Sequence, residues 1–218
     1  MEKKGGGRME NGFVYDEEKT EKAALGMNEA KKTVYLLGDS NCMGYREYVR
    51  KALAGKANVV FPEENGRCCQ YMLLMLRTWS GLCDPDNVAV VQFNTGHWDI
   101  AHWNDEEISL TSVEDYCKYI LRIAEALKRM YRNAKIVFAT TMPMNPNGEN
   151  SINSRTTKEI MVYNEAVKKA LAGKVLIHDL FETVKDYGEE RFLDYCHLTE
   201  EANEEVGKKI AEFIEKLL

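Results

Sequence analysis

The chain has 218 residues, a formal net charge of −6 and a hydrophobic fraction of 44%. This length and composition exclude a disordered chain and favour one α/β domain over two. The negative charge, with no long cluster of lysine or arginine, argues against a nucleic-acid partner. The apolar runs are too short to span a bilayer, so no membrane association is expected.

The first 30 residues are polar and contain the run Gly5-Gly6-Gly7, so we expect residues 1–30 to form a flexible N-terminal arm. A short helix is predicted over residues 16–25, and the arm is a candidate contact for a homo-oligomer. The main domain is expected to cover residues 31–218. The N-terminus has no apolar signal core, which predicts a cytoplasmic protein whose six cysteines are free thiols.

From residue 33 onward, short apolar runs alternate with helical patterns. The runs predict five strands, at residues 33–37, 57–60, 88–93, 135–139 and 174–177. Apolar strands separated by helices are typical of a parallel sheet that is covered on both faces. The expected fold is therefore α/β: a three-layer α/β/α sandwich around a five-stranded parallel sheet.

Several predicted helices carry their own start or stop signals. A helix over residues 41–54 follows the first strand, and Thr111 with Glu114 has the pattern of a capping box. Gly173 is suited to end the helix before the fifth strand. The last helix is predicted to begin at Thr199 or just after it.

Polar residues follow every predicted strand. They are Gly38-Asp39-Ser40, Gly66, the segment 94–99 (Asn-Thr-Gly-His-Trp-Asp), the segment 140–143 (Thr-Thr-Met-Pro) and Asp194-x-x-His197. The carboxyl ends of parallel strands meet at one edge of a sheet, so these residues are expected to gather there.

Ser40, His197 and Asp194 together predict nucleophilic catalysis. A serine hydroxyl becomes a good nucleophile when an imidazole takes its proton, and the imidazole needs a third group to fix its tautomer. The competing interpretation is structural: Asp39 and Ser40 as a helix cap, His197 as a helix-start residue and Asp194 as a turn residue.

These segments resemble the SGNH (GDSL-type) hydrolases over about residues 33–217. Gly38-Asp39-Ser40-Asn41 is similar to the first block of that family, Gly66 to the glycine of the second, and Asp194-x-x-His197-Leu198-Thr199 to the last. The resemblance implies the flavodoxin-like SGNH fold, with Ser40 as nucleophile, His197 as base and Asp194 as its partner. It also implies that the backbone N–H groups of Ser40 and Gly66 stabilise the oxyanion.

The third block departs from the usual Gly-x-Asn-Asp pattern. Placing Gly96 on the motif glycine puts Trp98 where the asparagine belongs. Asn94, directly after the strand, is therefore the expected third oxyanion donor, with a plain turn residue as the alternative. A missing donor typically costs about 10²–10³ in rate.

The remaining residues of this edge are candidates for binding substrate: Asp39, His97, Trp98 and Trp103. The two tryptophans either stack on a sugar ring or pack the loop against the core. The spacing of His97, Asp99 and His102 matches no metal motif, so no metal and no cofactor are expected. Residues 145–154 are polar and turn-rich, and form either a rim over the cleft or an ordinary surface loop.

The resemblance implies a serine esterase for short-chain esters, with an acetylated carbohydrate such as a xylo-oligosaccharide as the leading substrate. The alternatives within the same chemistry are a lysophospholipase or thioesterase and a sugar O-acyltransferase. A non-catalytic carbohydrate-binding domain on the same scaffold is the alternative from another class. A nucleotide-binding protein ranks lower, because the chain has no Gly-x-Gly-x-x-Gly and no P-loop.

Overall fold

The computed structural model describes residues 9–10, 13–14, 27–28, 30–148 and 153–218. Within the N-terminal arm, β1 (Met9–Glu10) pairs antiparallel with β2 (Phe13–Val14), a pairing that the sequence did not predict. The helix expected over residues 16–25 lies outside the described residues. The flexibility of the arm and its role in an oligomer stay predictions.

The main domain is built on the predicted five-stranded parallel sheet, with strand order β4-β3-β5-β7-β9. Its strands are β3 (Thr33–Leu37), β4 (Asn58–Val60), β5 (Val88–Phe93), β7 (Lys135–Ala139) and β9 (Leu176–His178). Three of them have the predicted bounds. The central strands β3, β5 and β7 are nearly all apolar because both of their faces are covered.

The fifth strand begins two residues later than predicted, because residues 172–175 form the turn that follows the preceding helix, which ends at Leu171. Gly173 has a φ of +71°, and the N–H of Lys174 donates to the carbonyl of Leu171. Gly173 therefore ends that helix in a left-handed conformation, as expected. The shift brings His178, which the sequence analysis had not singled out, into the strand.

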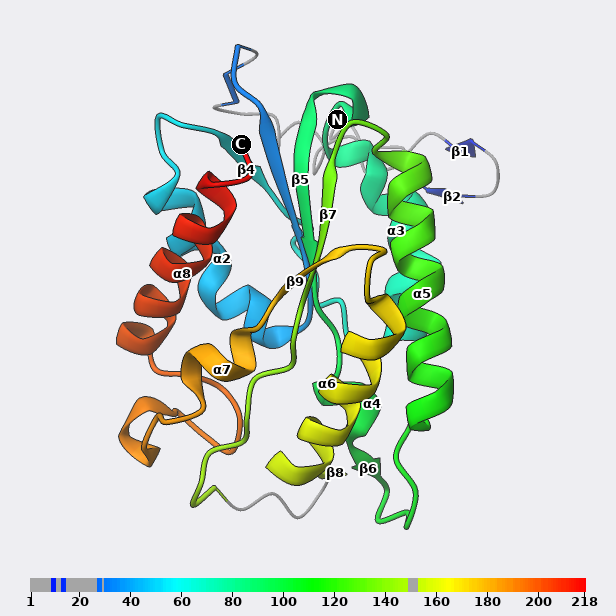
Figure 1. The fold of residues 1–218 in the computed structure, drawn as a ribbon, viewed down its shortest axis with the longest axis vertical. Coiled ribbons are helices and arrows are strands. Elements are labelled where there is room, and N and C mark those ends of the chain that lie inside the picture. The colour runs from blue at the N-terminus through cyan, green and yellow to red at the C-terminus, as the bar shows by residue number, and fades with distance from the viewer. Residues whose placement is uncertain (1–8, 11–12, 15–26, 29, 149–152) are drawn as a thin grey trace, which may run out of the picture.

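Helices cover both faces of the sheet, which confirms the three-layer sandwich (Figure 1). On one face lie α2 (Ser40–Ala52), α7 (Leu180–Val184) and α8 (Glu200–Glu215). On the other lie α3 (Cys69–Trp79), α5 (Val113–Met130) and α6 (Thr157–Leu171). Alternate residues of β3 face the two layers: Val34 and Leu36 pack toward α2 and α8, while Tyr35 and Leu37 pack toward α3 and α5.

The capping box predicted at Thr111 is wrong. The cap of α5 is Ser112, whose hydroxyl accepts the N–H of Asp115, while Thr111 turns inward and donates to Asp99. The start of α8 is as predicted, because Thr199 accepts the N–H of Ala202. A full capping box is instead present at Thr156 and Glu159, before α6.

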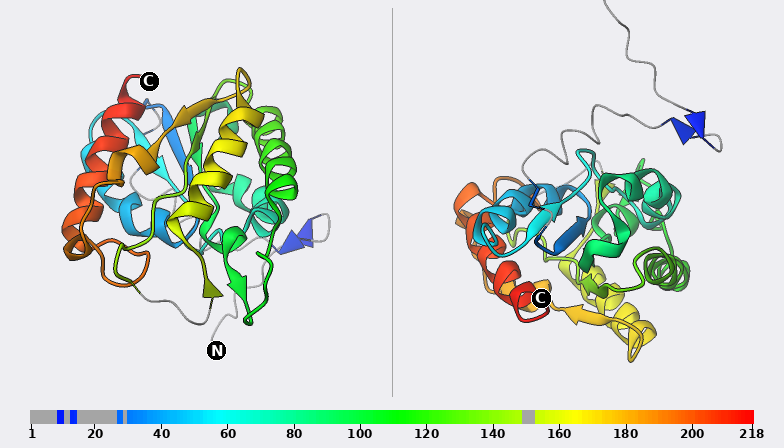
Figure 2. Two further views of the ribbon diagram at one scale, coloured as in Figure 1. Left: turned by 60° about the horizontal axis from the view of Figure 1, so that its bottom comes forward. Right: turned by 90° about the horizontal axis from the view of Figure 1, so that it is seen from above.

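Short elements cluster where the sheet strands end, at the bottom of Figure 1. α4 (His97–Ile100) follows β5, and β6 (His102–Trp103) pairs antiparallel with β8 (Asn153–Ser154). Figure 2 turns this end toward the viewer. Part of the predicted polar loop after β7 is thus a strand at the rim, and residues 149–152 lie outside the described residues.

Three 3₁₀ turns complete the described elements, at Ser80–Leu82, Pro85–Asn87 and Glu189–Arg191. All six cysteines are free, as the sequence analysis expected. Across the part of the chain that the structure describes, no helix combines the length and apolarity needed to cross a bilayer.

Candidate active site

Ser40, His197 and Asp194 form one hydrogen-bonded chain. Nε2 of His197 lies 2.7 Å from Oγ of Ser40, and Nδ1 of the same ring lies 2.7 Å from Oδ2 of Asp194. Ser40 is the first residue of α2, directly after β3, and the other two precede α8. The two ends of the domain meet because α2 and α8 pack side by side on one face of the sheet.

Asp194 is held as a carboxylate that orients the imidazole. Its Oδ1 accepts the backbone N–H groups of Cys196 and His197, each at 2.8 Å. Burial alone would raise the pKa of Asp194, but these donors and the His197 ring outweigh it and leave the pKa below its usual value. Because the carboxylate of Asp194 accepts at Nδ1, it keeps a proton on that nitrogen of the His197 ring. Nε2 is then left to exchange a proton with Ser40.

Asp39 lies under the site and does not reach it. Its side chain is fully buried and accepts the backbone N–H of Asn41, which caps α2, and the Nδ2–H of Asn94 at 3.0 Å. Burial raises the pKa of Asp39, while these donors act in the opposite direction. The prediction that Asp39 contacts substrate is therefore corrected: it fixes the first turn of α2.

The two oxyanion donors expected besides Ser40 are engaged elsewhere. Asn94 is buried, with its Nδ2 on Asp39 and its Oδ1 accepting the hydroxyl of Tyr45 at 3.1 Å. The N–H of Gly66 donates to the carbonyl of Gly38 at 2.8 Å. A Cβ on Gly66 would lie 2.5 Å from that carbonyl oxygen, so this position needs glycine for the close approach of two backbones.

A cavity of about 170 Å³ opens beside Ser40 and His197. Of the predicted binding residues, His97, Trp98 and Trp103 line it, and Asp39 does not. Four further lining residues were not predicted: Asn65, Asn153, Arg155 and Tyr195. Two of them had a signal that the sequence analysis passed over, since Asn65 adjoins Gly66 and Tyr195 lies between Asp194 and His197. The other two reach the cavity through the β6–β8 pairing, which no local pattern predicts.

The amide of Asn65 is oriented for donation. Its Oδ1 accepts the backbone N–H of Arg67 at 2.8 Å, and Arg67 has a φ of +52° that closes this tight turn. With the carbonyl oxygen fixed, the NH₂ group is the part of the side chain left for a ligand. Asn65 is therefore a candidate for the donor role that the sequence had assigned to Asn94 and Gly66.

His97, Asp99 and His102 do not converge. Nδ1 of His97 accepts from Arg155, Asp99 accepts the N–H of Cys69 at the start of α3, and His102 pairs with Glu159. Burial, and then the nearby Arg155, lower the pKa of His97 well below its usual value, so its ring is neutral. These three side chains thus have separate structural partners within the described part of the chain.

Cys196 lies beside the imidazole, with its Sγ 3.8 Å from Nδ1 of His197. Together with Asp194 and His197 it forms a group whose ligand atoms lie within 4.8 Å of one another. Burial raises the pKa of Cys196 to about 12, which disfavours the thiolate needed by a metal or a nucleophile. Both imidazole nitrogens already have partners, so the group acts as a hydrogen-bonded chain.

The two tryptophans form one wall of the cavity. Their rings lie 5.0 Å apart at 37°, and the indole N–H of Trp103 donates to the carbonyl of Trp98 at 3.0 Å. The rings thus pack on each other and line the cavity, and stacking of a sugar on them stays a prediction.

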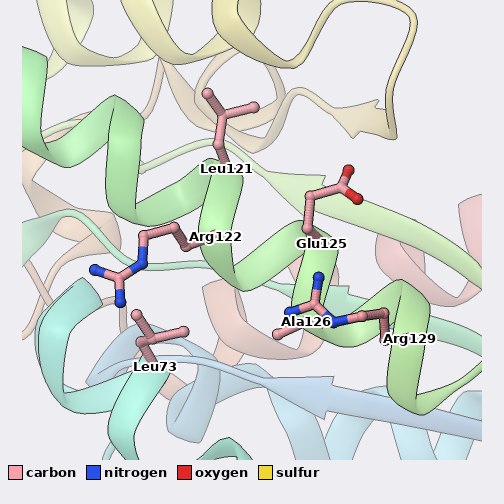
Figure 3. Close-up of a pocket in the computed structure, with 6 residues that line it drawn as sticks. All are labelled: Leu73, Leu121, Arg122, Glu125, Ala126 and Arg129. Atoms are coloured by element: carbon pink, nitrogen blue, oxygen red, sulfur yellow. The ribbon is translucent and has the colours of Figure 1, made fainter.

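A larger hollow, of about 320 Å³, lies between α3 and α5 (Figure 3). It is lined by Leu73, Leu121, Arg122, Glu125, Ala126 and Arg129. None of these side chains is a nucleophile or a general base of the histidine type. The smaller cavity is therefore the candidate active site, because it has a possible nucleophile, Ser40, and a possible base, His197.

No family model and no curated protein sequence matches the chain. Solved structures do match its fold. A GDSL-like lipase from Bacteroides thetaiotaomicron has a TM-score of 0.71 at 19% identity, over 94% of this chain and 98% of that one. An acetyl xylan esterase has a TM-score of 0.66 at 16% identity, over 84% and 99%. A carbohydrate acetylesterase from Sinorhizobium meliloti has a TM-score of 0.66 at 13% identity, over 86% and 100%. The fold is therefore that of the SGNH hydrolases, as the sequence resemblance implied.

Proposed function

We propose that this protein is a serine esterase that removes acetyl groups from a carbohydrate. The observation that carries the proposal is the hydrogen-bonded chain Ser40–His197–Asp194 at the edge of a small cavity. A helix-capping serine needs no imidazole at its hydroxyl, and a non-catalytic sugar-binding domain needs no such chain. Both alternatives leave this geometry unexplained.

The proposed reaction is a double displacement. Ser40 attacks the acyl carbon while His197 takes its proton at Nε2, and Asp194 stabilises the imidazolium that forms. His197 then returns the proton to the departing alcohol. Water, activated by the same nitrogen, cleaves the acyl-enzyme and releases the acid.

The developing oxyanion is assigned to two donors. The N–H of Ser40 belongs to the first turn of α2, whose amides have no acceptor within the helix and favour negative charge. The NH₂ group of Asn65 is the second donor, because the Arg67 N–H fixes the opposite end of its amide. Preorganised donors of this kind are the largest single contribution in many acyl-transfer enzymes.

A short acyl group fits the cavity best. Its volume is about 170 Å³, and it is bounded by Trp98, Trp103 and Tyr195. Long fatty acyl chains need an extended apolar groove, so we rank a lysophospholipase or thioesterase lower. The carbohydrate part of the proposal rests on these aromatic walls and on two structural neighbours named as carbohydrate-active acetyl esterases.

The proposal extends to the compartment and the partners. Six free thiols, two of them adjacent at Cys68 and Cys69, agree with a reducing compartment, which we propose is the cytoplasm. The partner is then a small-molecule or oligosaccharide ester that enters the cell. Transfer of the acyl group to a sugar hydroxyl instead of water would use the same acyl-enzyme.

The first test is hydrolysis of 4-nitrophenyl esters by the wild type and by Ser40→Ala. The wild type should hydrolyse the acetate ester, with kcat/KM falling steeply toward the octanoate. The variant should lose at least about 10³-fold in rate while its circular dichroism spectrum stays unchanged. Full activity of the variant would refute the assignment of Ser40, and a preference for octanoate would refute the short-chain substrate.

A further inference from the structure

Arg155 brings a permanent positive charge to the wall of the cavity that holds Ser40 and His197. The residue follows β8 and reaches the cavity because the β6–β8 pairing draws this segment against α4. The charge is notable in a chain with a net charge of −6. It has no role in the acyl-transfer steps proposed above.

Arg155 is held in place by neutral groups. Its Nε donates to Nδ1 of His97 at 3.1 Å, one Nη to the carbonyl of Asn153 at 3.0 Å, and the other to Sγ of Cys196 at 3.3 Å. The guanidinium also lies over the ring of Tyr195, at 5.2 Å from its centroid. These contacts fix its position and orientation without any opposite charge.

The charge is not neutralised by a direct partner among the described residues, where no carboxylate lies within ion-pair distance of the guanidinium. The buried carboxylate of Asp39 acts on Arg155 only through space, since no hydrogen bond or ion pair joins the two side chains. Of the groups that contact the guanidinium, Cys196 stays a neutral thiol because burial raises its pKa to about 12, and the imidazole of His97 can carry only a positive charge. A partly buried cation is normally paired, so the pairing anion is expected to come from a ligand.

A guanidinium has five N–H donors in a planar fork, and three bonds hold Arg155 in place. The remaining donors are suited to a carboxylate, which guanidinium groups bind with two parallel hydrogen bonds. The surroundings are those of a sugar site, because Trp98, Trp103 and Tyr195 line the same cavity. A carboxylate on a sugar ring satisfies both features at once.

We propose that Arg155 binds the carboxylate of an acetylated acidic sugar of the uronic acid type, and so determines the substrate class of the esterase. The inference rests on the proposed function for the ester, but the anion site itself can be tested without catalysis. The negative net charge of the chain disfavours a long polyanion, so the ligand is a monosaccharide or short oligosaccharide.

The kinetic test compares two O-acetylated substrates that differ only at C6. One is the methyl glycoside of galacturonic acid, whose carboxylate is free, and the other is the methyl glycoside of galactose. We expect the wild type to favour the acid by about 10- to 100-fold in kcat/KM, the value of one charge-assisted contact. Arg155→Gln should reduce this ratio by at least about tenfold through KM for the acid, and Arg155→Lys should keep part of it. Arg122→Gln, which removes the same charge in the distant hollow of Figure 3, should leave the ratio unchanged.

The binding test uses Ser40→Ala, which separates the anion site from the reaction. Galacturonate should bind at least about tenfold more tightly than galactose by calorimetry, and the double variant with Arg155→Gln should lose the difference. Equal binding of the two sugars, or an equal loss of kcat/KM on both esters in Arg155→Gln, would overturn the proposal. If the wild type hydrolyses no ester but Ser40→Ala still discriminates the sugars, the proposed function fails and the anion site stands.

Discussion

Asn94 donates a 3.0 Å hydrogen bond from its Nδ2 to the buried carboxylate of Asp39, 55 positions earlier in the chain. The bond joins the end of β5 to the cap of α2, and Ser40 is the next residue after that cap. Asn94 therefore helps to fix the position of Ser40 through Asp39. Both ends of its amide are engaged in this scaffold, which is why the proposed oxyanion contact is assigned to Asn65.

The role of Asn94 predicts a loss of stability in Asn94→Ala. The change removes one of the donors to the buried carboxylate of Asp39 and the acceptor of the buried hydroxyl of Tyr45. The free energy of unfolding should fall by about 2–5 kcal/mol in a urea titration. Asn133→Ala, at an exposed residue with one 3.4 Å bond, is the control and should cost less than about 0.5 kcal/mol. Equal stability of the two variants would contradict the assignment.

Asn65→Ala tests the oxyanion contact. The only hydrogen bond of this half-exposed side chain among the described residues is the one from the Arg67 N–H, so its removal should change the melting temperature by only a few degrees. The value of kcat for a short acetyl ester should fall by about 10²–10³, with KM within about threefold. If Asn65→Ala keeps its kcat and only its KM rises, Asn65 contributes to ground-state binding and not to the oxyanion contact.

A methyl group added at Gly96 should strongly lower the stability of the fold. Its φ is +146°, and a Cβ there would lie 2.0 Å from Oγ1 of Thr141. Gly96→Ala should therefore displace the start of α4, which carries His97 and Trp98, and lower the free energy of unfolding by at least about 3 kcal/mol. Gly55→Ala is the matched control, since Gly55 also has a positive φ of +83° but nothing within 4 Å. It should cost about 1 kcal/mol, and a similar cost for both variants would contradict the steric account.

His178 predicts a loss of stability in acid. Burial lowers the pKa of this ring to about 4, from an unfolded value near 6.5. In this site its Nδ1 donates to Oε1 of Gln92, and the ring stacks 4.0 Å from the ring of Phe213. Between these two values the unfolded chain binds the proton and the folded one does not. Stability is therefore full above about pH 6.5 and is lost as the pH falls toward 4, by about 3 kcal/mol from this residue.

The measurement is the free energy of unfolding of the wild type and of His178→Gln at pH 7, 6, 5 and 4. The buried ring of His97 shifts in the same direction, so both proteins should weaken in acid. The difference between them isolates His178 and should shrink by about 3 kcal/mol from pH 7 to pH 4. A difference that stays constant with pH would show that His178 is not neutral in the folded protein.

Local patterns predicted most of the fold, because the apolar runs of β3, β5 and β7 are buried on both faces and have sharp ends. The strand β9 was shifted, since the apolar run that leads into it begins at Val175, which still belongs to the turn after the helix that Gly173 ends. The cap at Ser112 was misplaced by one residue, because Thr111 and Ser112 are chemically alike and only the tertiary contact with Asp99 separates them.

The candidate site was predictable where one short segment carries the chemistry, as in Asp194 to His197. It was not predictable where the partners are distant. Asn94 could be assigned to Asp39 only once β5 and α2 were placed side by side, and Arg155 only once β8 was paired with β6. A polar residue after a strand is expected at this edge, but its partner depends on the packing of the whole sheet.

The most direct test of the central claim is the stoichiometry and position of labelling by a fluorophosphonate, read by intact mass and peptide mapping. Because Nε2 of His197 lies 2.7 Å from Oγ of Ser40, the proposed base can take the proton of this hydroxyl, and the wild type should gain one adduct per chain, located on Ser40. His197→Ala should react at least about 10³-fold more slowly, and Ser40→Ala should gain no adduct. A folded wild type that stays unlabelled, or one labelled elsewhere and not at Ser40, would contradict the account.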